Sequence, residues 1–379
     1  MEERTGRRPR IADVAREAGV SKTAVSFAFN RPSRLAPETA IRIRTVADSL
    51  GYRPDPVARM LTQRSTRTLG VLTPQALSVI FSNPFFGAFS EGVALAAEQE
   101  GFALDFISPL HGSLTRAIER AMVDGVVAIG VSAQHGEVEQ LRVAGLPLVM
   151  VDSSALPDLP TIEVDDEAGA FAAAQHLLAL GHRDILVVGI ESTPGTPPEP
   201  DGVGGRRARG YRKALAGAGI ELMRGAYVVA PSTIEGGMAA LRRTWEDGLR
   251  PTGVLVMSDV MAIGVLRAAR ELGLRVPADL SVVGFDDIDI SQHTHPPLTT
   301  VHQPIRLKGE TAGRLVLAMI EGRDPRPASV RLDTRLIIRE STGPVARSAK
   351  RTDATCRPVR LQRTSGHPNP NPRGGQPTA

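Results

Sequence analysis

Short apolar runs alternate with longer amphipathic stretches along most of the chain, from about residue 69 to about residue 343. The apolar runs predict strands at Leu69–Leu72, Val126–Ile129, Leu146–Val151, Ile185–Ile190, Gly253–Met257 and Ser281–Phe285. The Ala- and Leu-rich stretches between them predict helices at Gly87–Gln99, Gly169–Leu180, Arg207–Ala218, Gly236–Trp245, Val260–Leu272 and Leu307–Ile320. This alternation is typical of βαβ units around a parallel sheet. Because about 270 residues exceed what one doubly wound sheet needs, we expect an α/β body of two lobes, each with a parallel, Rossmann-like sheet.

The N-terminal segment follows a different pattern, of short helices with interleaved arginines. Apolar positions on one face predict a helix at Ile11–Ala18, and Gly19 permits the left-handed turn that ends it. Ser21 is a natural N-cap for a second helix at Lys22–Phe29. A third helix is expected at Pro37–Leu50, with proline in its first turn. Two short helices across a tight, glycine-containing turn predict a helix-turn-helix.

The second helix of a helix-turn-helix enters the major groove of DNA, with its N-terminal side chains at the base edges. Here these side chains are Lys22, Thr23, Ser26 and Phe27, and Asn30 ends the helix. Lysine reaches a guanine edge, and threonine offers a hydroxyl or a methyl group. The pattern therefore predicts a DNA-binding head, and a three-helix bundle that binds another protein is the alternative.

Charge is segregated along the chain in a way that the net charge of +4 hides. Residues 1–68 carry a net charge of +7, residues 69–343 carry −9, and residues 344–379 carry +6. A basic head on an acidic body favours a polyanionic partner for the head and a separate role for the body. The last segment is rich in Pro, Arg, Gly and Thr without periodicity, so we expect residues 344–379 to be a disordered tail.

Composition narrows the class of protein further. The single cysteine, Cys356, excludes a disulfide framework and any four-cysteine zinc site, and it suits a reducing compartment. No apolar run approaches the roughly 18 residues that a membrane span needs, and the N-terminus lacks the apolar core of a secretory signal. His293, His295 and His302 do not have close metal-ligand spacing. We therefore expect a cytoplasmic protein without a metal or other cofactor.

A series of motifs runs through both parts of the chain in a fixed order. The head contains Asp13–Ser21, Val25-Ser26, Asn30 and Gly51–Pro54, and the body contains Ser82–Phe86, Val123–Val126, Leu148–Asp152, Gly181–Ile185, Arg207–Tyr211, Ser258-Asp259, Val283–Asp287 and Leu298–Pro304. Over about residues 10–342, these motifs closely resemble the LacI/GalR (lactose-repressor) family of transcriptional regulators. The resemblance implies a helix-turn-helix head and a two-lobed body of the periplasmic-binding-protein fold.

The same resemblance implies how the head meets DNA and how the chain divides. It implies that a homodimer binds a palindromic double-stranded operator through Lys22, Thr23, Ser26, Phe27 and Asn30. A short hinge helix at Pro56–Leu61 would place Ala58 and Leu61 in the minor groove, with Leu61 as the intercalating wedge. We expect a DNA-binding domain at 1–53, a hinge and linker at 54–68 and an effector-binding body at 69–343. Lobe one would span about 69–162 and 292–326, and lobe two about 163–291 and 327–343, joined by three crossings.

A small-molecule effector is expected in the cleft between the lobes. The resemblance carries over to seven effector-binding residues: Phe85, Phe86, Asp152, Arg207, Ser258, Asp259 and Asp286. The last three also follow strands, where ligands of α/β sheets bind. Carboxylates and an arginine beside an aromatic face suit a hydroxyl-rich ligand, so a sugar is favoured, with a nucleobase or a phosphorylated metabolite as alternatives.

Four of these seven residues also have a simpler interpretation. Arg207 could form a surface ion pair with Glu199 or Asp201, while Arg206 and Arg209 are expected to be solvated. The aromatic pair could belong to the core, and Asp286 and Asp287 could cap the next segment.

Two other classes of protein share this kind of body. A sugar-binding transport component is disfavoured by the N-terminal head and the missing signal segment. An enzyme is disfavoured because the sequence has no Gly-x-Gly-x-x-Gly after the first strand and no P-loop, Gly-x-Ser-x-Gly or His-Glu-x-x-His motif. The sequence therefore predicts a ligand-responsive transcriptional repressor that is not an enzyme.

Overall fold

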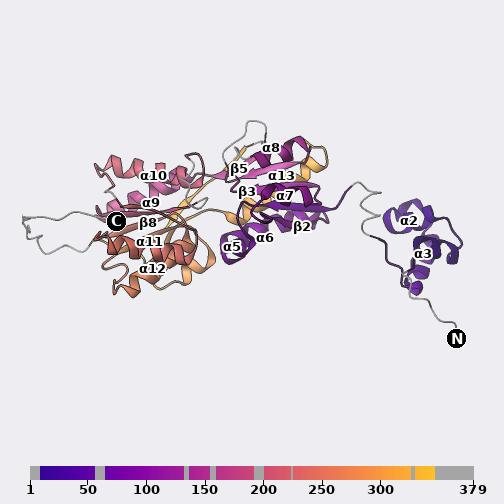
Figure 1. The fold of residues 1–379 in the computed structure, drawn as a ribbon, viewed down its shortest axis with the longest axis horizontal. Helices are drawn as coiled ribbons and strands as arrows, with labels where there is room; N and C mark the ends of the chain where they lie inside the picture. Colours follow the sequence, from indigo (N-terminus) through magenta and orange to yellow (C-terminus); the bar gives the residue numbers. More distant parts are fainter. Residues whose placement is uncertain are drawn as a thin grey trace, which may run out of the picture. The chain divides into compact units, whose positions relative to one another are not determined.

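The computed structural model describes residues 9–55, 65–131, 136–153, 159–191, 200–222, 225–325 and 329–345. Figure 1 follows the chain from the helical head into the α/β body. The head contains α1 (Ile11–Glu17), α2 (Lys22–Asn30), a 3-10 turn (Pro32–Arg34) and α3 (Pro37–Leu50). These bounds agree within one residue with the helices that the apolar pattern predicts.

Capping and a small apolar core explain why the head folds this way. The Ser21 hydroxyl accepts a hydrogen bond from the Ala24 N–H at 3.1 Å, so it caps α2 as expected. Gly51 ends α3 in the left-handed conformation, with φ of 68°. The three helices meet around a core that includes Val14, Val25 and Ile43, none of which is exposed.

The body contains two six-stranded sheets. The first has the order β11-β5-β4-β3-β1-β2, with β1 at Thr68–Leu72, β2 at Ala103–Ile107, β3 at Gly125–Ile129, β4 at Leu148–Val151, β5 at Thr161–Val164 and β11 at Ser329–Leu332. The second has the order β12-β10-β9-β8-β6-β7, with β6 at Ile185–Ile190, β7 at Tyr227–Ala230, β8 at Gly253–Val256, β9 at Ser281–Asp286, β10 at Thr299–His302 and β12 at Arg335–Ile337. Every neighbouring pair of named strands is parallel except β10 with β12. The predicted fold class is thereby confirmed.

The six strands that the sequence pattern predicted are all present, and the strands that it missed have a weaker apolar signal. Edge strands β2 and β11 alternate exposed with partly buried positions and carry charged side chains. β7 and β12, at the edges of the second sheet, are also only partly buried over most of their length. β5 and β10 are inner strands, but each is only four residues long and contains threonine. β4 and β8 are equally short but carry no polar side chain, whereas threonine, Glu163 and His302 interrupt the apolar runs of β5 and β10.

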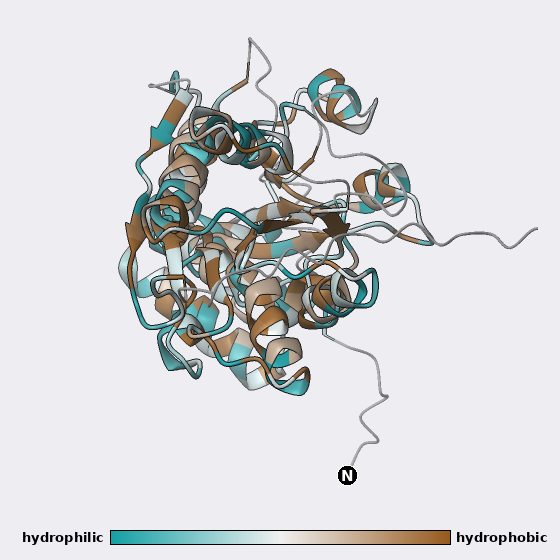
Figure 2. Ribbon diagram, turned by 90° about the vertical axis from the view of Figure 1, so that its left-hand side faces the viewer, coloured by the Kyte–Doolittle hydropathy of each residue, from teal (hydrophilic) through white to brown (hydrophobic). Residues whose placement is uncertain are grey.

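Helices pair across the faces of the sheets through close backbone contacts. The pairs are α6 (Pro84–Gln99) with α13 (Ile305–Ile320), α9 (Asp166–Ala179) with α10 (Val203–Gly217), and α11 (Ile234–Glu246) with α12 (Asp259–Glu271). Each of these six body helices begins one to four residues earlier than the sequence pattern predicts. Three shorter helices, α5 (Leu77–Ser82), α7 (Leu114–Arg120) and α8 (Gly136–Val143), were not predicted. Figure 2 shows brown, hydrophobic strands between helices whose faces are mixed teal and brown.

The chain passes between the two sheets three times, and two of the crossings correct the expected lobe boundaries. The segment at 292–326 was assigned to lobe one, but Thr299–His302 pairs with β9 in the second sheet. The segment at 327–343 was assigned to lobe two, but Ser329–Leu332 pairs with β5 in the first sheet. The crossings therefore follow β5, β10 and β11. Neither β10 nor β11 was predicted as a strand, so its pairing could not be assigned from the sequence.

Candidate functional site

One face of α2 carries all the residues expected to contact the major groove. Lys22 and Thr23 are exposed, and Ser26 and Phe27 are partly exposed one turn later. The Asn30 amide donates to the Ser26 hydroxyl at 3.3 Å, which links two successive turns of this face. The sequence-based assignment of these five residues to DNA binding stays a prediction, and the structure places them together.

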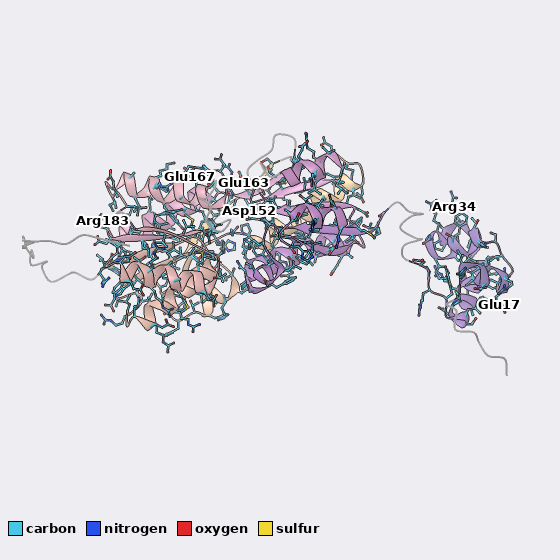
Figure 3. The ribbon with its side chains drawn as sticks, in the orientation of Figure 1. Glu17, Arg34, Asp152, Glu163, Glu167 and Arg183 are labelled. Atoms are coloured by element: carbon cyan, nitrogen blue, oxygen red, sulfur yellow. The ribbon has the colours of Figure 1, made fainter. Side chains whose placement is uncertain are left out.

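Two arginines outside α2 support this face. The Arg44 guanidinium donates two hydrogen bonds, of 3.2 and 3.0 Å, to the Ala28 carbonyl and so holds α2 against α3. The Arg34 guanidinium lies over the Phe27 ring at 5.6 Å, and Figure 3 labels Arg34 on the head. Phe27 cannot donate to a base, but an aromatic ring can contact the methyl group of thymine. Ala58 and Leu61, the expected minor-groove residues, lie outside the described residues.

In the body, expected effector residues from both lobes join one buried polar network. Asp152 follows β4 of the first sheet, and Asp286 is the last residue of β9 in the second. Both adopt a positive φ, 54° and 123°, which is unusual for residues other than glycine. Such strained backbone persists only where the surroundings fix it, and it gathers at ligand sites. Figure 3 labels Asp152.

Arg207 is the central cation of the second lobe. Its side chain is 4% exposed, its Nε donates to Asp166 Oδ1 at 2.8 Å, and its Nη1 donates to the Met257 carbonyl and lies 3.5 Å from Asp286 Oδ1. The guanidinium also stacks over the Phe285 ring at 3.5 Å. This burial excludes the alternative of a surface ion pair.

Two other arginines of α10, Arg206 and Arg209, differ in how far they are exposed. Arg206, expected to be solvated, is 12% exposed and donates to Asp166 Oδ2 at 2.9 and 2.7 Å, so that expectation was wrong. Arg206 and Arg207 are neighbours on α10, and both guanidinium groups donate to the Asp166 carboxylate. Arg209 is 43% exposed and pairs with Glu167 at 3.4 Å.

Lys308 contacts Asp152 and Gln303 and was missed by the sequence analysis. Its side chain is fully buried, and its Nζ donates to both oxygens of Asp152 at 2.8 Å and to Gln303 Oε1 at 2.6 Å. The Gln303 amide in turn donates to Asp286 Oδ1 at 2.6 Å. A signal was present in the sequence, because Lys308 lies one turn after Ile305 and one turn before Ala312, on the apolar face of α13.

These contacts join into one chain, which we call the polar network. In order along that chain, its members are Asp152, Lys308, Gln303, Asp286, Arg207, Asp166 and Arg206. Three carboxylates, of Asp152, Asp166 and Asp286, face three cations, of Lys308, Arg206 and Arg207. The polar network thus carries no net charge when all six groups are ionised.

The carboxyl groups near Arg207 have shifted pKa values. Burial would raise the pKa of Asp166, but the charges of Arg207, Arg206 and Lys308 hold it below its usual value. Burial raises the pKa of Asp286 to about 6, against the opposing charge of Arg207 and the hydrogen bond from Gln303.

The remaining expected effector residues have partners within the protein. Asp259 is fully buried, and its carboxylate accepts from the Thr300 hydroxyl at 2.5 Å, the Ser291 hydroxyl at 2.6 Å and the Ile288 N–H at 3.1 Å. Burial, with the nearby charge of Asp286, raises the pKa of Asp259 to about 8. The Ser258 hydroxyl contacts that of Ser232 at 3.1 Å. Both residues are buried and bonded within the second lobe, and their assignment to effector binding stays a prediction.

Phe85 and Phe86 open α6 after the Asn83 cap. Their rings pack edge to face with centroids 5.3 Å apart, and both are partly buried against the core of the first lobe. The Lys308 ammonium lies 5.6 Å from the Phe85 ring centre, which joins this aromatic pair to the polar network. The two interpretations from the sequence, core and ligand contact, are both compatible with this position.

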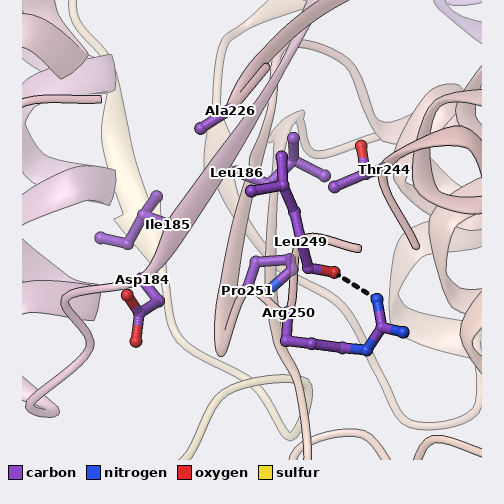
Figure 4. A pocket seen from close by; sticks show the side chains of 8 residues that line it. All are labelled: Asp184, Ile185, Leu186, Ala226, Thr244, Leu249, Arg250 and Pro251. Atoms are coloured by element: carbon purple, nitrogen blue, oxygen red, sulfur yellow. Dashed lines mark hydrogen bonds between the residues drawn. The ribbon is translucent and has the colours of Figure 1, made fainter. Parts of the chain in front are cut away.

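Two hollows are described in the body. Figure 4 shows the smaller, of about 10 Å³, where the Arg250 guanidinium donates to the Leu249 carbonyl at 2.8 Å. It has room for one water molecule and lies at the amino ends of β6 and β8, away from the polar network. The larger, of about 410 Å³, has the size of a small-molecule site and is lined by Asp166 and Arg206 of the polar network, with Glu163, Glu167, Arg209 and Arg331 among its other charged groups.

The described residues hold neither a metal cluster nor a membrane-spanning helix. No three His, Cys, Asp or Glu side chains there come together in a way that could hold a metal ion. None of the helices in that part of the chain has the length and apolar character to cross a membrane.

Comparison with known proteins separates the same two parts of the chain. Residues 10–55 match the family described as bacterial regulatory proteins, lacI family, and residues 174–342 match the periplasmic binding protein-like domain. The HTH-type transcriptional regulator CelR of Thermobifida fusca is 31% identical, with 88% of this chain and 98% of CelR aligned. The transcriptional repressor CytR of Escherichia coli K12 is 32% identical, with 88% of this chain and 96% of CytR aligned.

Solved structures give the same result for the whole fold. A lac repressor dimer bound to operator and the anti-inducer ONPF has a TM-score of 0.74 at 26% identity, covering 89% of this chain and all of that one. A CelR–cellobiose complex has a TM-score of 0.65 at 29% identity, covering 88% of this chain and all of that one.

Proposed function

This chain belongs to the LacI family of bacterial regulatory proteins and is a DNA-binding regulator of transcription, and from that premise we propose that it is a repressor controlled by a sugar-like effector. It binds a palindromic operator as a homodimer in the cytoplasm, where the operator lies. The observation that carries DNA binding is the continuous face of α2, where a capped first turn presents Lys22 and Thr23 to solvent.

Charge balance in the polar network supports an uncharged effector. Three carboxylates already face three cations, so the network has no surplus positive charge for a phosphate group. Carboxylates accept paired hydroxyl groups, and arginine donates to ring oxygens. The relatives point the same way, because one solved regulator is a complex with cellobiose and another contains bound ribose.

Within this proposal, the residues have different roles. Asp152, Asp286 and Arg207 contact the effector, beside the rings of Phe85 and Phe86. Lys308, Gln303 and Asp166 are the positioning residues that hold them, whereas Asp259 and Ser258 support the fold of the site. A ligand hydroxyl would replace a contact within the polar network, so binding changes how the two lobes are joined.

A thermal-shift screen of the purified protein against sugars, polyols, nucleosides and sugar phosphates tests the effector. A ligand at 100 times its Kd stabilises the folded state by about 2.7 kcal/mol. A selective neutral sugar is the expected result. A hit restricted to nucleosides or phosphorylated compounds would overturn the sugar proposal and leave the regulator in place.

Selection of duplexes from a random pool tests the operator. The expected result is a palindrome whose affinity falls steeply with salt, since each neutralised phosphate releases counterions. Lys22→Ala should weaken binding to the selected duplex at least tenfold, because its position is at the base edges. Glu17→Gln, an exposed position on α1, is the matched control and should bind as the unaltered protein does.

A further inference from the structure

The segment that enters the body from the linker is tied to one carboxylate. Asp124 accepts from the Ser65 hydroxyl at 2.6 Å, the Thr66 N–H at 2.7 Å, the Thr66 hydroxyl at 2.9 Å and the Arg67 N–H at 2.8 Å. Asp124 directly precedes β3, more than 50 residues along the chain from these donors. Both of its oxygens are therefore used to hold three consecutive residues.

Arg67 fixes the same segment by other contacts. Its φ is 54°, a left-handed conformation that is strained for a residue with a side chain. The Ala103 N–H donates to the Arg67 carbonyl at 2.8 Å, and the guanidinium donates to the Glu100 carbonyl and lies 4.5 Å from the Phe102 ring. The chain thus makes a defined bend where it enters β1, and the hydrogen bonds to Asp124 help to maintain that bend.

Asp124, with the hydrogen bonds that it accepts from residues 65–67, forms what we call the anchor. The anchor lies at the amino edge of the first sheet, and Asp152 lies at the carboxyl edge of the same sheet. β3 is buried at all five positions and pairs in parallel with β4, which ends directly before Asp152. A fully buried inner strand is a stiff connection, because its neighbours fix it on both sides. A displacement of Asp152 at the carboxyl edge of the first sheet would therefore be transmitted through β4 and β3 to Asp124 at the amino edge.

We propose that Asp124 is a positioning residue for operator binding, which fixes where and in which direction the linker leaves the first lobe. The proposal rests on the operator binding proposed above. A palindrome needs two heads at a set spacing, so a fixed linker exit raises the effective concentration of the second head at its half-site. Loss of the anchor weakens binding to a palindrome more than binding to unrelated DNA, where spacing does not matter.

The experiment uses full-length variants and two duplexes of equal length, the palindrome selected with the unaltered protein and a scrambled version. Asp124→Asn keeps the shape of the side chain but removes its charge and one acceptor oxygen. We expect it to lower affinity for the palindrome at least tenfold and affinity for the scrambled duplex less than twofold. Ser65→Ala/Thr66→Val removes two donors from the linker side and leaves Asp124 in place, so it should give a smaller loss in the same direction.

Asp184→Asn is the matched control, because Asp184 is an exposed carboxylate directly before β6 in the other sheet. It should leave both affinities unchanged. Folded Asp124→Asn and Ser65→Ala/Thr66→Val proteins that bind the palindrome as the unaltered protein does would overturn the anchor, as would equal losses on both duplexes. If the unaltered protein selects no duplex, operator binding itself fails, which is a different result from the failure of the anchor alone.

Discussion

Arg207 is held by charge from two directions. Its Nε donates a hydrogen bond to Asp166, and its Nη1 lies 3.5 Å from Asp286 Oδ1. All three side chains are buried. Burial would lower the pKa of Arg207, but the charges of Asp166 and Asp286 raise it above its usual value, so it stays charged. Its removal would leave two buried carboxylates without their main counterion.

We therefore expect Arg207→Ala to lower the free energy of unfolding by about 3–5 kcal/mol, as measured by urea denaturation. The variant should still bind operator but no longer respond to the effector. Arg209→Ala, on the exposed side of the same helix, should change stability by less than about 0.5 kcal/mol. Release of operator by effector in Arg207→Ala would show that Arg207 is not a ligand contact.

Asp259 gives the body a pH dependence whose sign can be worked out. Its pKa rises from 3.8 to about 8 on folding, mainly through burial. Between these values the folded chain keeps a proton that the unfolded chain releases, so this residue makes the free energy of unfolding fall as pH rises. Its contribution is greatest in acid and is lost towards pH 8.

Asp259→Asn stays neutral at every pH and should remove this contribution. Denaturation at pH 5, 6, 7 and 8 should show the variant gaining stability relative to the unaltered protein as pH rises. Parallel curves over this range would contradict the raised pKa of Asp259.

At the scale of elements, the helix pairs of the body are held close by glycine. In α6, a Cβ on Gly92 would lie 2.0 Å from the Arg306 carbonyl oxygen of α13. In α11, a Cβ on Gly237 would lie 2.0 Å from the Met261 carbonyl oxygen of α12. The obstacle in each case is backbone, so the helices would have to separate to admit a methyl group.

Gly92→Ala should therefore cost about 3 kcal/mol or more in the free energy of unfolding, measured by thermal or urea denaturation. Gly87→Ala is the matched change on the same helix, where a Cβ would meet no atom within 4 Å. It should stabilise the protein by about 0.5–1 kcal/mol, because alanine favours the helix more than glycine does. Equal effects of the two changes would mean that α6 and α13 are not in close contact.

At the scale of the whole molecule, the regulator needs its parts to act together. In the proposed response, the positively charged head binds DNA and the neutral polar network binds the effector. The anchored linker positions the head for the operator. The three crossings after β5, β10 and β11 let a ligand between the lobes alter their arrangement. Coupling of this kind joins two distinct sites through one moving element.

Leu61 tests this coupling at the linker, although it lies outside the described residues. Leu61→Ala should weaken binding to the selected palindrome more than binding to scrambled DNA, because a wedge acts only where the base step is opened. Fluorescence anisotropy with both duplexes measures the two losses. A loss of the same size on both would contradict the wedge.

Local patterns in the sequence determined the head and the frame of the body. Caps and breakers such as Ser21 and Gly51 fixed helix ends, and alternating apolar runs identified six inner strands of the sheets. The carboxyl ends of strands pointed to Ser258, Asp259 and Asp286. These features are encoded within a few neighbouring residues, so a single sequence is enough to find them.

The tertiary structure alone decided which distant groups meet. Lys308 pairs with Asp152 across 156 positions and Arg207 with Asp166 across 41, and the edge strands β11 and β12 join opposite sheets. No local period marks such pairs, because burial in the fold selects them: an ion taken out of water requires a counterion, wherever in the chain that counterion lies. The sequence determined which elements form, and the packing of those elements determined which side chains share a site.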